Sequence, residues 1–322
     1  MKAIVYQKYG SPDVVRVEEV PEPTPKDNEV LIRVRATTVS TAEMAGRKGD
    51  PFIARLFTGL RRPKKIPGSE LAGDVESTGK EVQRFTEGDQ IVAATGADLG
   101  AHAEYVCVAE DGALARKPAD ATYEEAVAVC EAGLTALPFL RDKGRIQSGQ
   151  SVLINGASGA VGTGAVQLAK HFGAEVTGVC STKHLDLVRS LGADEVIDYT
   201  TLDFTGTGET YDIMFDAVGK SSFSRCRGSL KKHGVYLTTV PSLAIFPQML
   251  WTSKIGSRRA AIALTGLRPP REKVKDLVLF GELMGTGDIR PVIDRSYRLE
   301  QTAEAHRYVE TGHKQGSVVI TL

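Results

Sequence analysis

The sequence predicts an α/β protein in which a β-rich domain is combined with a doubly wound parallel sheet. Residues 1–120 contain alternating and β-branched apolar runs separated by Gly, Pro and Asp, as strands joined by turns do. From residue 151 onward, strand patterns alternate with helix patterns, which is typical of a parallel sheet with right-handed crossovers. The chain has 322 residues, a length that suits two domains better than one core.

The N-terminal region is expected to be rich in strands and to end in a helix. The strand-like stretches are MKAIVYQKY, VVRVEEV, EVLIRVRATTVS, ELAGDVESTG, DQIVAA and AEYVCVAE. A helix is expected over residues 122–140, because Thr122 suits its N-cap and Glu125 follows at the spacing of a capping box.

The second region is expected to alternate strands with helices. We expect strands at residues 151–155, 175–180, 195–198, 212–217, 235–240 and 258–264, and helices at 161–172 and 183–191. The tail is expected to rejoin the first domain, with helices at 272–284 and 301–310 and strands at 291–294 and 317–322. The predicted domain boundaries follow from these patterns: 1–122 and 267–322 for the β-rich domain and 123–266 for the parallel-sheet domain.

The charge balance argues against a polyanionic partner. The sequence has 40 Lys and Arg and 40 Asp and Glu, so no global field draws in nucleic acid or an anionic membrane. No apolar stretch approaches the roughly 20 residues of a membrane span, and the first residues lack a signal-peptide core. The 4 cysteines form no CxxC pair, which is typical of free thiols in a reducing compartment. The expected location is the cytoplasm.

A glycine-rich turn follows the first strand of the second region, in the stretch NGASGAVGTGAVQLAK. Gly156 suits the positive φ of a tight turn, and Gly159 and Gly162 fit the later positions of the dinucleotide fingerprint. Ala157 replaces one fingerprint glycine. Because the pattern follows a strand and opens a helix, it predicts a Rossmann domain that holds a pyrophosphate at the helix N-terminus. The alternative is a turn whose glycines serve close packing only.

The end of the next strand indicates which dinucleotide is bound. An NAD site commonly has Asp or Glu there to accept from the ribose hydroxyls, but this strand ends in VCSTK. A carboxylate would repel a 2′-phosphate, whereas Ser181 and Lys183 offer a hydroxyl and an ammonium group. The N-terminus of the next helix adds a favourable partial charge. We therefore expect NADP(H); the alternative role of Lys183 is that of a solvated helix lysine.

Six stretches carry a resemblance to a known family: MKAIVYQKYGSPDVVRVEEVPEPTPKDNEVLIRV, IPGSELAGDVESTGKEVQRFTEGDQIV, EAGLTAL, NGASGAVGTGAVQLAK, LGADEVIDY and GSVVITL. Together they resemble the zinc-independent quinone oxidoreductase branch of the medium-chain dehydrogenase/reductase superfamily, over essentially the whole chain. The resemblance implies a GroES-like substrate domain formed by both ends of the chain. It also implies that NADP(H) lies in a cleft between this domain and the Rossmann domain.

The resemblance implies which residues contact the cofactor. Thr135 would lie near the nicotinamide, the glycine turn would hold the pyrophosphate, and Tyr199 would join Ser181 and Lys183 around the adenosine phosphate. Residues of the tail would close the site. The full set is Thr135, Ala157, Ser158, Gly159, Ala160, Val161, Gly162, Ser181, Lys183, Tyr199, Val218, Gly219, Val240, Gln315, Gly316 and Ser317.

The resemblance also implies that the catalytic zinc of the related alcohol dehydrogenases is missing. Ser40, Ser69 and Glu131 stand at the positions of the three protein ligands in the zinc branch, and two serines cannot replace the Cys and His ligands that zinc needs. Cys130 is next to Glu131, but we interpret it as a packed helix thiol. Ser40 stands where close relatives often have Asn, and it is the candidate for polarising or positioning the substrate.

The predicted reaction follows from the missing metal. Without zinc there is no strong Lewis acid to activate a simple alcohol, so we expect NADPH-dependent reduction of small hydrophobic quinones or activated α,β-unsaturated carbonyls. The alternatives are a zinc-free NADP(H)-dependent alcohol or carbonyl oxidoreductase and a non-catalytic NADPH-binding protein.

Two further expectations concern surfaces. Residues 41–65 and 241–257, with Phe246, Met249 and Trp251, are expected either to line an apolar substrate cleft or to lie in the core or a dimer interface. We expect a homodimer formed through the strand at 258–264, because an exposed strand edge invites pairing.

Overall fold

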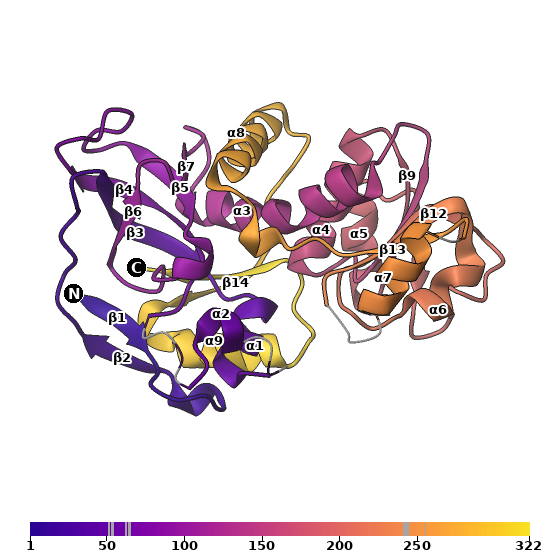
Figure 1. Ribbon diagram of the computed structural model, residues 1–322, viewed down its shortest axis with the longest axis horizontal. Helices are drawn as coiled ribbons and strands as arrows, with labels where there is room; N and C mark the ends of the chain where they lie inside the picture. Colours follow the sequence, from indigo (N-terminus) through magenta and orange to yellow (C-terminus); the bar gives the residue numbers. More distant parts are fainter. Residues whose placement is uncertain (51, 53–54, 62, 64–65, 241–244, 255) are drawn as a thin grey trace. The chain divides into compact units, whose positions relative to one another are not determined.

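The computed structural model describes residues 1–322 except for residues 51, 53–54, 62, 64–65, 241–244 and 255. Contacts divide the chain into two compact units. The first unit comprises Met1–Glu131 and Gly266–Leu322, and the second unit comprises Ala132–Thr265. Each unit is built around its own sheet, and many of the elements are labelled in Figure 1.

A seven-stranded sheet forms the centre of the first unit. Its strands follow the order β14-β15-β3-β4-β5-β7, and β6 pairs with the first half of β3. β15 is antiparallel to β3, so the C-terminal strand completes the N-terminal sheet, as the sequence predicts. β1 and β2 form a separate antiparallel pair. The strands are β1 (Lys2–Val5), β2 (Arg16–Glu19), β3 (Glu29–Thr38), β4 (Glu70–Thr78), β5 (Gln90–Ala94), β6 (Tyr105–Ala109), β7 (Ala113–Arg116), β14 (Ile293–Arg298) and β15 (Ser317–Thr321).

Apolar side chains on this sheet form the core of the first unit. Ile32, Leu71, Ile91 and Leu114 come from β3, β4, β5 and β7, and all four are fully buried in the same apolar cluster. α8 packs against β7, and α9 packs against α1. The helices of this unit are α1 (Thr41–Lys48), α2 (Arg55–Thr58), α8 (Pro270–Thr286) and α9 (Thr302–Glu310).

The helix expected at 122–140 is α3 (Tyr123–Leu137), which crosses the division between the units. Its capping box is present: the Glu125 amide donates to Thr122 Oγ1 at 3.1 Å, and the Thr122 amide donates to Glu125 Oε2 at 2.9 Å. The regular helix ends before Pro138, which has no amide hydrogen to continue the pattern. A wider helical turn, Pro138–Gly144, follows it.

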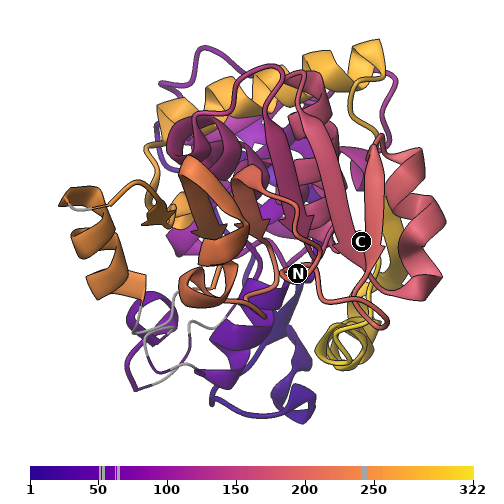
Figure 2. The same ribbon diagram turned by 90° about the vertical axis from the view of Figure 1, so that its right-hand side faces the viewer.

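The second unit contains the predicted doubly wound parallel sheet. Its strand order is β10-β9-β8-β11-β12-β13, and every pairing is parallel. Figure 2 shows these strands side by side, with α5 beside β10 at one edge and α7 beside β13 at the other. The strands are β8 (Ser151–Asn155), β9 (Glu175–Cys180), β10 (Glu195–Asp198), β11 (Tyr211–Asp216), β12 (Leu230–Thr238) and β13 (Arg259–Ala261), and the helices are α4 (Ala160–His171), α5 (Leu185–Ser190), α6 (Phe223–Cys226) and α7 (Ile245–Lys254).

Several elements differ from the expected bounds at their ends. β12 begins at Leu230 rather than at residue 235, because Leu230 already pairs with Tyr211 of β11. β13 ends at Ala261, since only three of its residues pair with β12. β14 begins two residues after Pro291, which cannot donate to a strand ladder.

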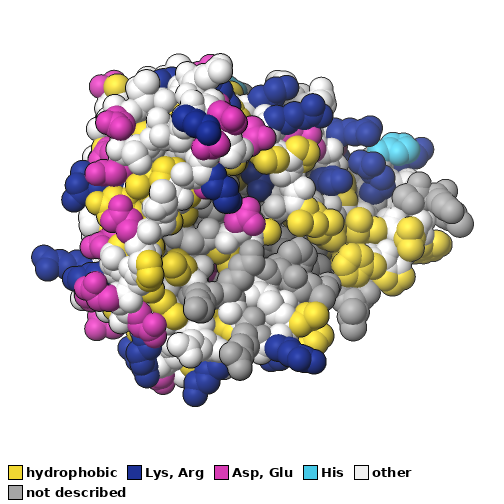
Figure 3. Space-filling model, turned by 60° about the vertical axis from the view of Figure 1, so that its left-hand side comes forward, with side chains coloured by type: hydrophobic (Ala, Val, Ile, Leu, Met, Phe, Trp, Pro, Cys, Tyr) yellow, Lys and Arg dark blue, Asp and Glu magenta, His cyan; other side chains and the backbone are white. Residues whose placement is uncertain are grey.

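The surface of the described residues carries positively and negatively charged side chains and some large apolar side chains. Leu250, Leu264 and Leu267 are each more than half exposed. Figure 3 shows hydrophobic side chains lying next to a group of Lys and Arg side chains on one face. No helix within the described ranges has both the length and the apolar character needed to cross a membrane.

Candidate functional site

The carboxyl ends of the parallel strands meet at one edge of the sheet in the second unit. Asn155 at the end of β8 is in register with Asp216 of β11, and Asp216 is in register with Thr238 of β12. On the other side, Asp198 of β10 is in register with Cys180 of β9. Ligands of open parallel sheets bind at this edge, and most of the predicted cofactor residues follow these strand ends.

The glycine turn has the form of an anion cradle. Gly156 has φ 83°, and the amides of Gly156 and Ala157 both donate to the Val179 carbonyl at 3.0 Å. α4 begins after Gly159, whose position has no side-chain cap, and the first-turn amides of a helix have no intrahelical acceptor. These amides can therefore hold a pyrophosphate.

The two later glycines have different roles. A Cβ on Gly159 would meet only the Gly156 carbonyl oxygen, at 3.6 Å, so space is left open in front of the turn. A Cβ on Gly162 would lie 2.0 Å from the same oxygen. Gly159 leaves room for a ligand, whereas Gly162 lets the helix pack against the turn. The residues present therefore fit a dinucleotide.

Asp216 organises this edge and was not found by the sequence analysis. Its buried carboxylate accepts from Asn155 Nδ2 at 3.0 Å, the Gly219 amide at 2.9 Å, the Ser221 amide at 2.8 Å and the Tyr236 hydroxyl at 2.9 Å. The signal in the sequence was an acid that ends a buried apolar strand. The carboxylate fixes the loop after β11 against the end of β8.

The structure brings the predicted loop residues of this unit together. A Cβ added to Gly156 would lie 2.4 Å from Val218 Cγ1, and one added to Gly219 would lie 2.4 Å from Val240 Cβ. Val218 and Val240 are 42% and 46% exposed. Their apolar side chains therefore face outward beside the glycine turn, where an aromatic ring could pack on them.

The predicted adenosine-phosphate residues follow β9 and β10. Ser181 and Lys183 come directly after β9, Tyr199 comes directly after β10 and is 55% exposed, and the Tyr199 amide donates to the Cys180 carbonyl at 3.1 Å. An acid that the sequence analysis overlooked lies here: Asp198 accepts from the hydroxyls of Thr182 and Thr200. These bonds lower the pKa of Asp198, led by the one from Thr182.

The remaining predicted cofactor residues are placed as follows. Thr135 lies in the last turns of α3 and is half-buried. The Gln315 amide donates to Asp294 Oδ2 at 2.9 Å. Ser317 is buried, and its hydroxyl donates to the Ala128 carbonyl at 3.5 Å. The side chain of Ser317 is therefore engaged within the first unit.

The three positions equated with zinc ligands lie in a buried polar cluster of the first unit. Ser40 caps α1: its hydroxyl accepts from the Glu43 amide, and its amide donates to Glu43 Oε2, both at 3.1 Å. Ser69 donates to Glu70 Oε2 at 2.5 Å. Glu131 is paired with Lys314, with 3.5 Å between Oε1 and Nζ. We call Glu43, Glu70 and Glu131 the carboxylate cluster.

The carboxylates of this cluster affect one another. Burial raises the pKa of Glu70 to about 7; the hydrogen bond from Ser69 opposes the rise and the charge of Glu131 adds to it. Burial also raises the pKa of Glu43, and the charge of Glu70 raises it further. His102 lies 3.7 Å from Glu43, and burial lowers the pKa of this histidine to about 4. Glu70 can thus hold a proton near neutral pH.

The residues present do not fit a catalytic zinc. Zinc in proteins is bound by thiolate, imidazole and carboxylate groups, whereas two of the three positions carry neutral serine hydroxyls, and the third is a carboxylate paired with a lysine. Among the described residues, no three His, Cys, Asp or Glu side chains are grouped closely enough to hold a metal ion. Cys130 is 1% exposed, and its thiol pKa is raised by burial.

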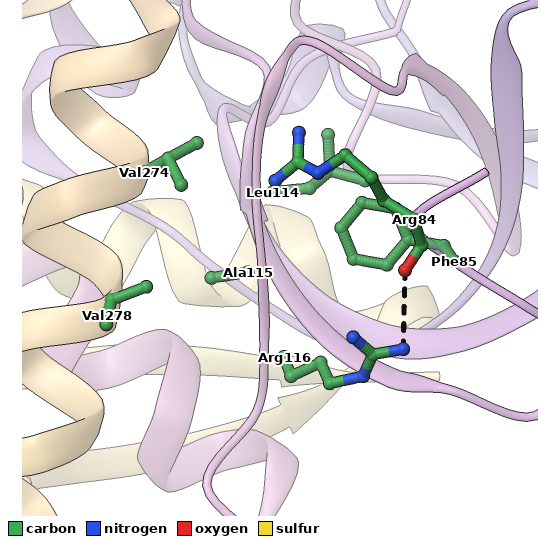
Figure 4. Close-up of a pocket in the computed structure, with 7 residues that line it drawn as sticks. All are labelled: Arg84, Phe85, Leu114, Ala115, Arg116, Val274 and Val278. Carbon is green, nitrogen blue, oxygen red and sulfur yellow. Dashed lines mark hydrogen bonds between the residues drawn. The ribbon is translucent and has the colours of Figure 1, made fainter. Parts of the chain in front are cut away.

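A pocket of about 420 Å³ lies elsewhere in the first unit, between β7 and α8. Figure 4 shows Val274 and Val278 of α8 facing Ala115, with Phe85 and two arginines opposite them. Arg116 is paired with Asp89 and donates to the Arg84 carbonyl. None of its lining residues belongs to the predicted site.

The two segments predicted to be apolar cleft or interface are described only in part. Residues 51, 53–54, 62, 64–65, 241–244 and 255 lie outside the described residues. Phe246 and Trp251 on α7 are 42% and 52% exposed, whereas Met249 packs against the core of the second unit. The named residues are thus divided between surface and core.

Comparisons with known proteins agree with this architecture. Residues 26–138 match the alcohol dehydrogenase GroES-like domain, and residues 191–320 match a family described as zinc-binding dehydrogenase. The chain is 31% identical to the chloroplast envelope quinone oxidoreductase homolog of Arabidopsis thaliana, over 99% of this chain and 98% of that protein. It is also 31% identical to the chloroplastic NADPH-dependent alkenal/one oxidoreductase of the same plant, over 99% of this chain and 79% of that protein.

A solved structure supports the same assignment. The quinone oxidoreductase from Coxiella burnetii superposes with a TM-score of 0.89 at 29% identity, over 100% of this chain and 99% of that one. Both the resemblance in sequence and the predicted fold class are confirmed. The chain therefore belongs to the quinone oxidoreductase-like branch of the medium-chain dehydrogenase/reductase superfamily of oxidoreductases, with a GroES-like domain and a Rossmann-like domain.

Proposed function

We propose that the protein reduces quinones or activated α,β-unsaturated carbonyls with NADPH by hydride transfer, without a metal. The observation that carries the proposal is the contrast between two sites. The glycine turn of the second unit leaves room for a dinucleotide at Gly159, whereas the zinc-ligand positions of the first unit hold Ser40, Ser69 and Glu131.

The residues assigned to the cofactor are those that follow the strand ends. The glycine turn and the first turn of α4, at Ala157–Gly162, hold the pyrophosphate, and Ser181, Lys183 and Tyr199 surround the adenosine phosphate. Thr135, Val218, Val240, Gln315 and Ser317 complete the proposed set. When bound, a reduced nicotinamide supplies a hydride.

The preference for NADPH over NADH rests on the end of β9. The ammonium group of Lys183 is exposed there and can form a charge-assisted hydrogen bond with a 2′-phosphate. The Arabidopsis alkenal/one oxidoreductase is named as an NADPH-dependent enzyme, which supports the same choice.

The choice of acceptor follows from the residues at the zinc-ligand positions. A metal stabilises developing charge on oxygen by several kcal/mol, and a conjugated acceptor needs less of this help because its π system spreads the charge. In the balanced reaction, hydride adds to the acceptor and a solvent proton completes a hydroquinone or a saturated carbonyl. Ser40 is the proposed positioning contact, since its hydroxyl hydrogen is not used by the cap of α1.

The test is NADPH consumption with a panel of acceptors. The purified protein is expected to oxidise NADPH with naphthoquinone and with a simple enone, and to act slowly on ethanol and other primary alcohols with NADP. Efficient alcohol oxidation with inert quinones and enones would favour an alcohol oxidoreductase. Tight NADPH binding without turnover of any acceptor would favour a binding protein.

Assembly and location complete the proposal. We propose a homodimer formed through β13, which lies at the edge of the parallel sheet. We propose a reducing compartment such as the cytoplasm, supported by the free thiols of Cys107, Cys130, Cys180 and Cys226. Two of the relatives named above are chloroplastic proteins, so fractionation of the source cells is the direct check.

A further inference from the structure

Lys314 is unusual among the buried cations of the first unit. Arg47 donates to the Gly10 carbonyl and to Glu310, and Lys273 Nζ donates to the Gly266 carbonyl at 3.2 Å. Lys117 Nζ donates to the Pro118 carbonyl at 2.8 Å. In contrast, Lys314 Nζ has no hydrogen-bond acceptor among the described residues, although nine-tenths of its side chain is buried.

The partner of Lys314 is similarly incomplete. Glu131 Oε1 lies 3.5 Å from Nζ, which is an ion pair but longer than a good hydrogen bond. Glu131 Oε2 is buried without a hydrogen-bond partner, and the side chain is only 7% exposed. A buried ammonium group and a buried carboxylate thus form an ion pair, while Lys314 Nζ and Glu131 Oε2 make no hydrogen bonds within the described part of the chain.

Unused donors on a buried cation indicate a site for an oxygen ligand. Buried polar groups are normally satisfied, and an unsatisfied donor costs free energy that an acceptor returns when it binds. The other two members of the carboxylate cluster have partners of their own: Glu43 bonds with Ser40, and Glu70 bonds with Ser69. The N–H bonds of Nζ that do not face Glu131 remain available to a ligand.

We propose that Lys314 donates a hydrogen bond to the carbonyl oxygen of the acceptor, and that Glu131 is the positioning residue that holds the ammonium group in place. The inference rests on the proposed function and names the group that stabilises the negative charge on the acceptor oxygen during the reaction. Gln315 and Thr135 are proposed cofactor residues. Lys314 directly precedes Gln315, and Glu131 lies one turn of α3 before Thr135.

The chemistry balances without a further reactant. Hydride forms the new C–H bond at the β-carbon, and the π electrons of the enone move toward the carbonyl oxygen. The ammonium group of Lys314 stabilises the negative charge there and keeps its own proton. Water then gives a proton to the α-carbon. Preorganised donors of this kind are effective because the site excludes water.

The primary test compares Lys314→Met with Lys314→Arg, and Lys275→Met serves as the matched control. Lys275 is an exposed lysine of α8 in the same unit. Removal of one oxyanion donor commonly lowers turnover about 100-fold or more, and we expect a loss of about that size in kcat with an enone for Lys314→Met. Lys314→Arg should recover a measurable part of the loss, and Lys275→Met should behave as the unmodified protein.

The acceptor series separates a catalytic role from a structural one. A quinone gives a less basic oxygen anion than an enone, so Lys314→Met should slow quinone reduction much less than enone reduction. The Kd of NADPH, measured by nucleotide fluorescence, should stay within about twofold. Equal losses with both acceptors, or a weakened NADPH complex with an unchanged rate at saturation, would overturn the proposal.

A second variant guards against unfolding. Lys314→Met leaves Glu131 as an unpaired buried charge, so the double variant Lys314→Met/Glu131→Gln removes both charges. It is expected to unfold at the same temperature as the unmodified protein or higher, and still to be slow with the enone. Full enone activity in the folded double variant would refute the role of Lys314. If the unmodified protein reduces no acceptor, the proposed function itself fails.

Discussion

Asn155 Nδ2 donates to Asp216 Oδ1 at 3.0 Å, which ties together the ends of two neighbouring parallel strands. Both residues are buried. Gly156 directly follows Asn155, and Val218 lies two residues after Asp216. Asp216 also accepts from two amides of its own loop and from the Tyr236 hydroxyl. One carboxylate therefore sets the position of two segments that are proposed to hold the cofactor.

Asp216→Ala is expected to weaken both the fold and cofactor binding. The substitution leaves several buried donors without an acceptor, and each unsatisfied donor costs about 1–3 kcal/mol. We expect a loss of about 3 kcal/mol or more in the free energy of unfolding, measured with urea, and a higher Kd for NADPH. Asp212→Ala is the control, because this half-exposed acid lies at the other end of β11. An Asp216→Ala protein with unchanged NADPH affinity would contradict the role.

The sequence predicted the second unit more fully than the site within the first. β8, β9 and β10 have the predicted bounds, because short apolar runs between glycines and polar residues have few alternative pairings. The glycine turn was predictable for a similar reason: a positive φ at Gly156 and a close approach at Gly162 leave little choice of residue. Constraints of this kind depend on residues that are adjacent in the sequence, so the sequence alone can predict them.

Interactions between distant residues could not be predicted in the same way. Lys314 lies 183 residues after Glu131 in the chain, and nothing in HKQGS distinguishes a buried ammonium group from a solvated one. Asp198 could not be predicted beside the end of β9 because it belongs to β10, and the register of the two strands brings it there. The strand register and the chain topology determine both the Glu131–Lys314 pair and the position of Asp198.

Gly159→Val and Gly162→Val are expected to fail for different reasons. Valine at 159 meets no close protein atom at its Cβ, so the fold should persist while the side chain blocks the pyrophosphate position. Valine at 162 places Cβ 2.0 Å from a backbone oxygen, so the fold itself should be destabilised. Thermal unfolding and NADPH titration separate the two effects. An NADPH affinity close to normal in Gly159→Val would mean that the turn does not hold the cofactor.

The purified protein is expected to contain no stoichiometric zinc. The neutral Ser40 hydroxyl accepts from the Glu43 amide, the neutral Ser69 hydroxyl donates to Glu70, and Glu131 is paired with Lys314. Elemental analysis should find far less than one zinc per chain, and EDTA should leave NADPH oxidation unchanged. One tightly bound zinc per chain, with activity lost on its removal, would overturn the metal-free mechanism.

Leu264→Glu is expected to separate a dimer into monomers. β13 is an edge strand, and Leu264, which follows it, is 59% exposed. A charge placed beside this edge would be desolvated in an interface, which is costly. Sedimentation at micromolar concentration should show a dimer for the unmodified protein and a monomer for the variant. Val278→Glu is the control, since it changes an exposed valine of the first unit. A monomeric unmodified protein would contradict the proposal.

Lys183→Ala and Asp198→Asn are expected to change NADPH affinity in opposite directions. A charge-assisted hydrogen bond contributes about 1.5–3 kcal/mol, so loss of Lys183 should weaken NADPH roughly ten- to a hundredfold and leave NADH nearly unchanged. Asp198 is a charged acid beside the same strand end, and its removal should strengthen NADPH because a repulsive charge is lost. The Kd values of NADPH and NADH are measured by titration for both variants and for the unmodified protein. Equal effects of Lys183→Ala on NADPH and NADH would show that this lysine does not contact the 2′-phosphate.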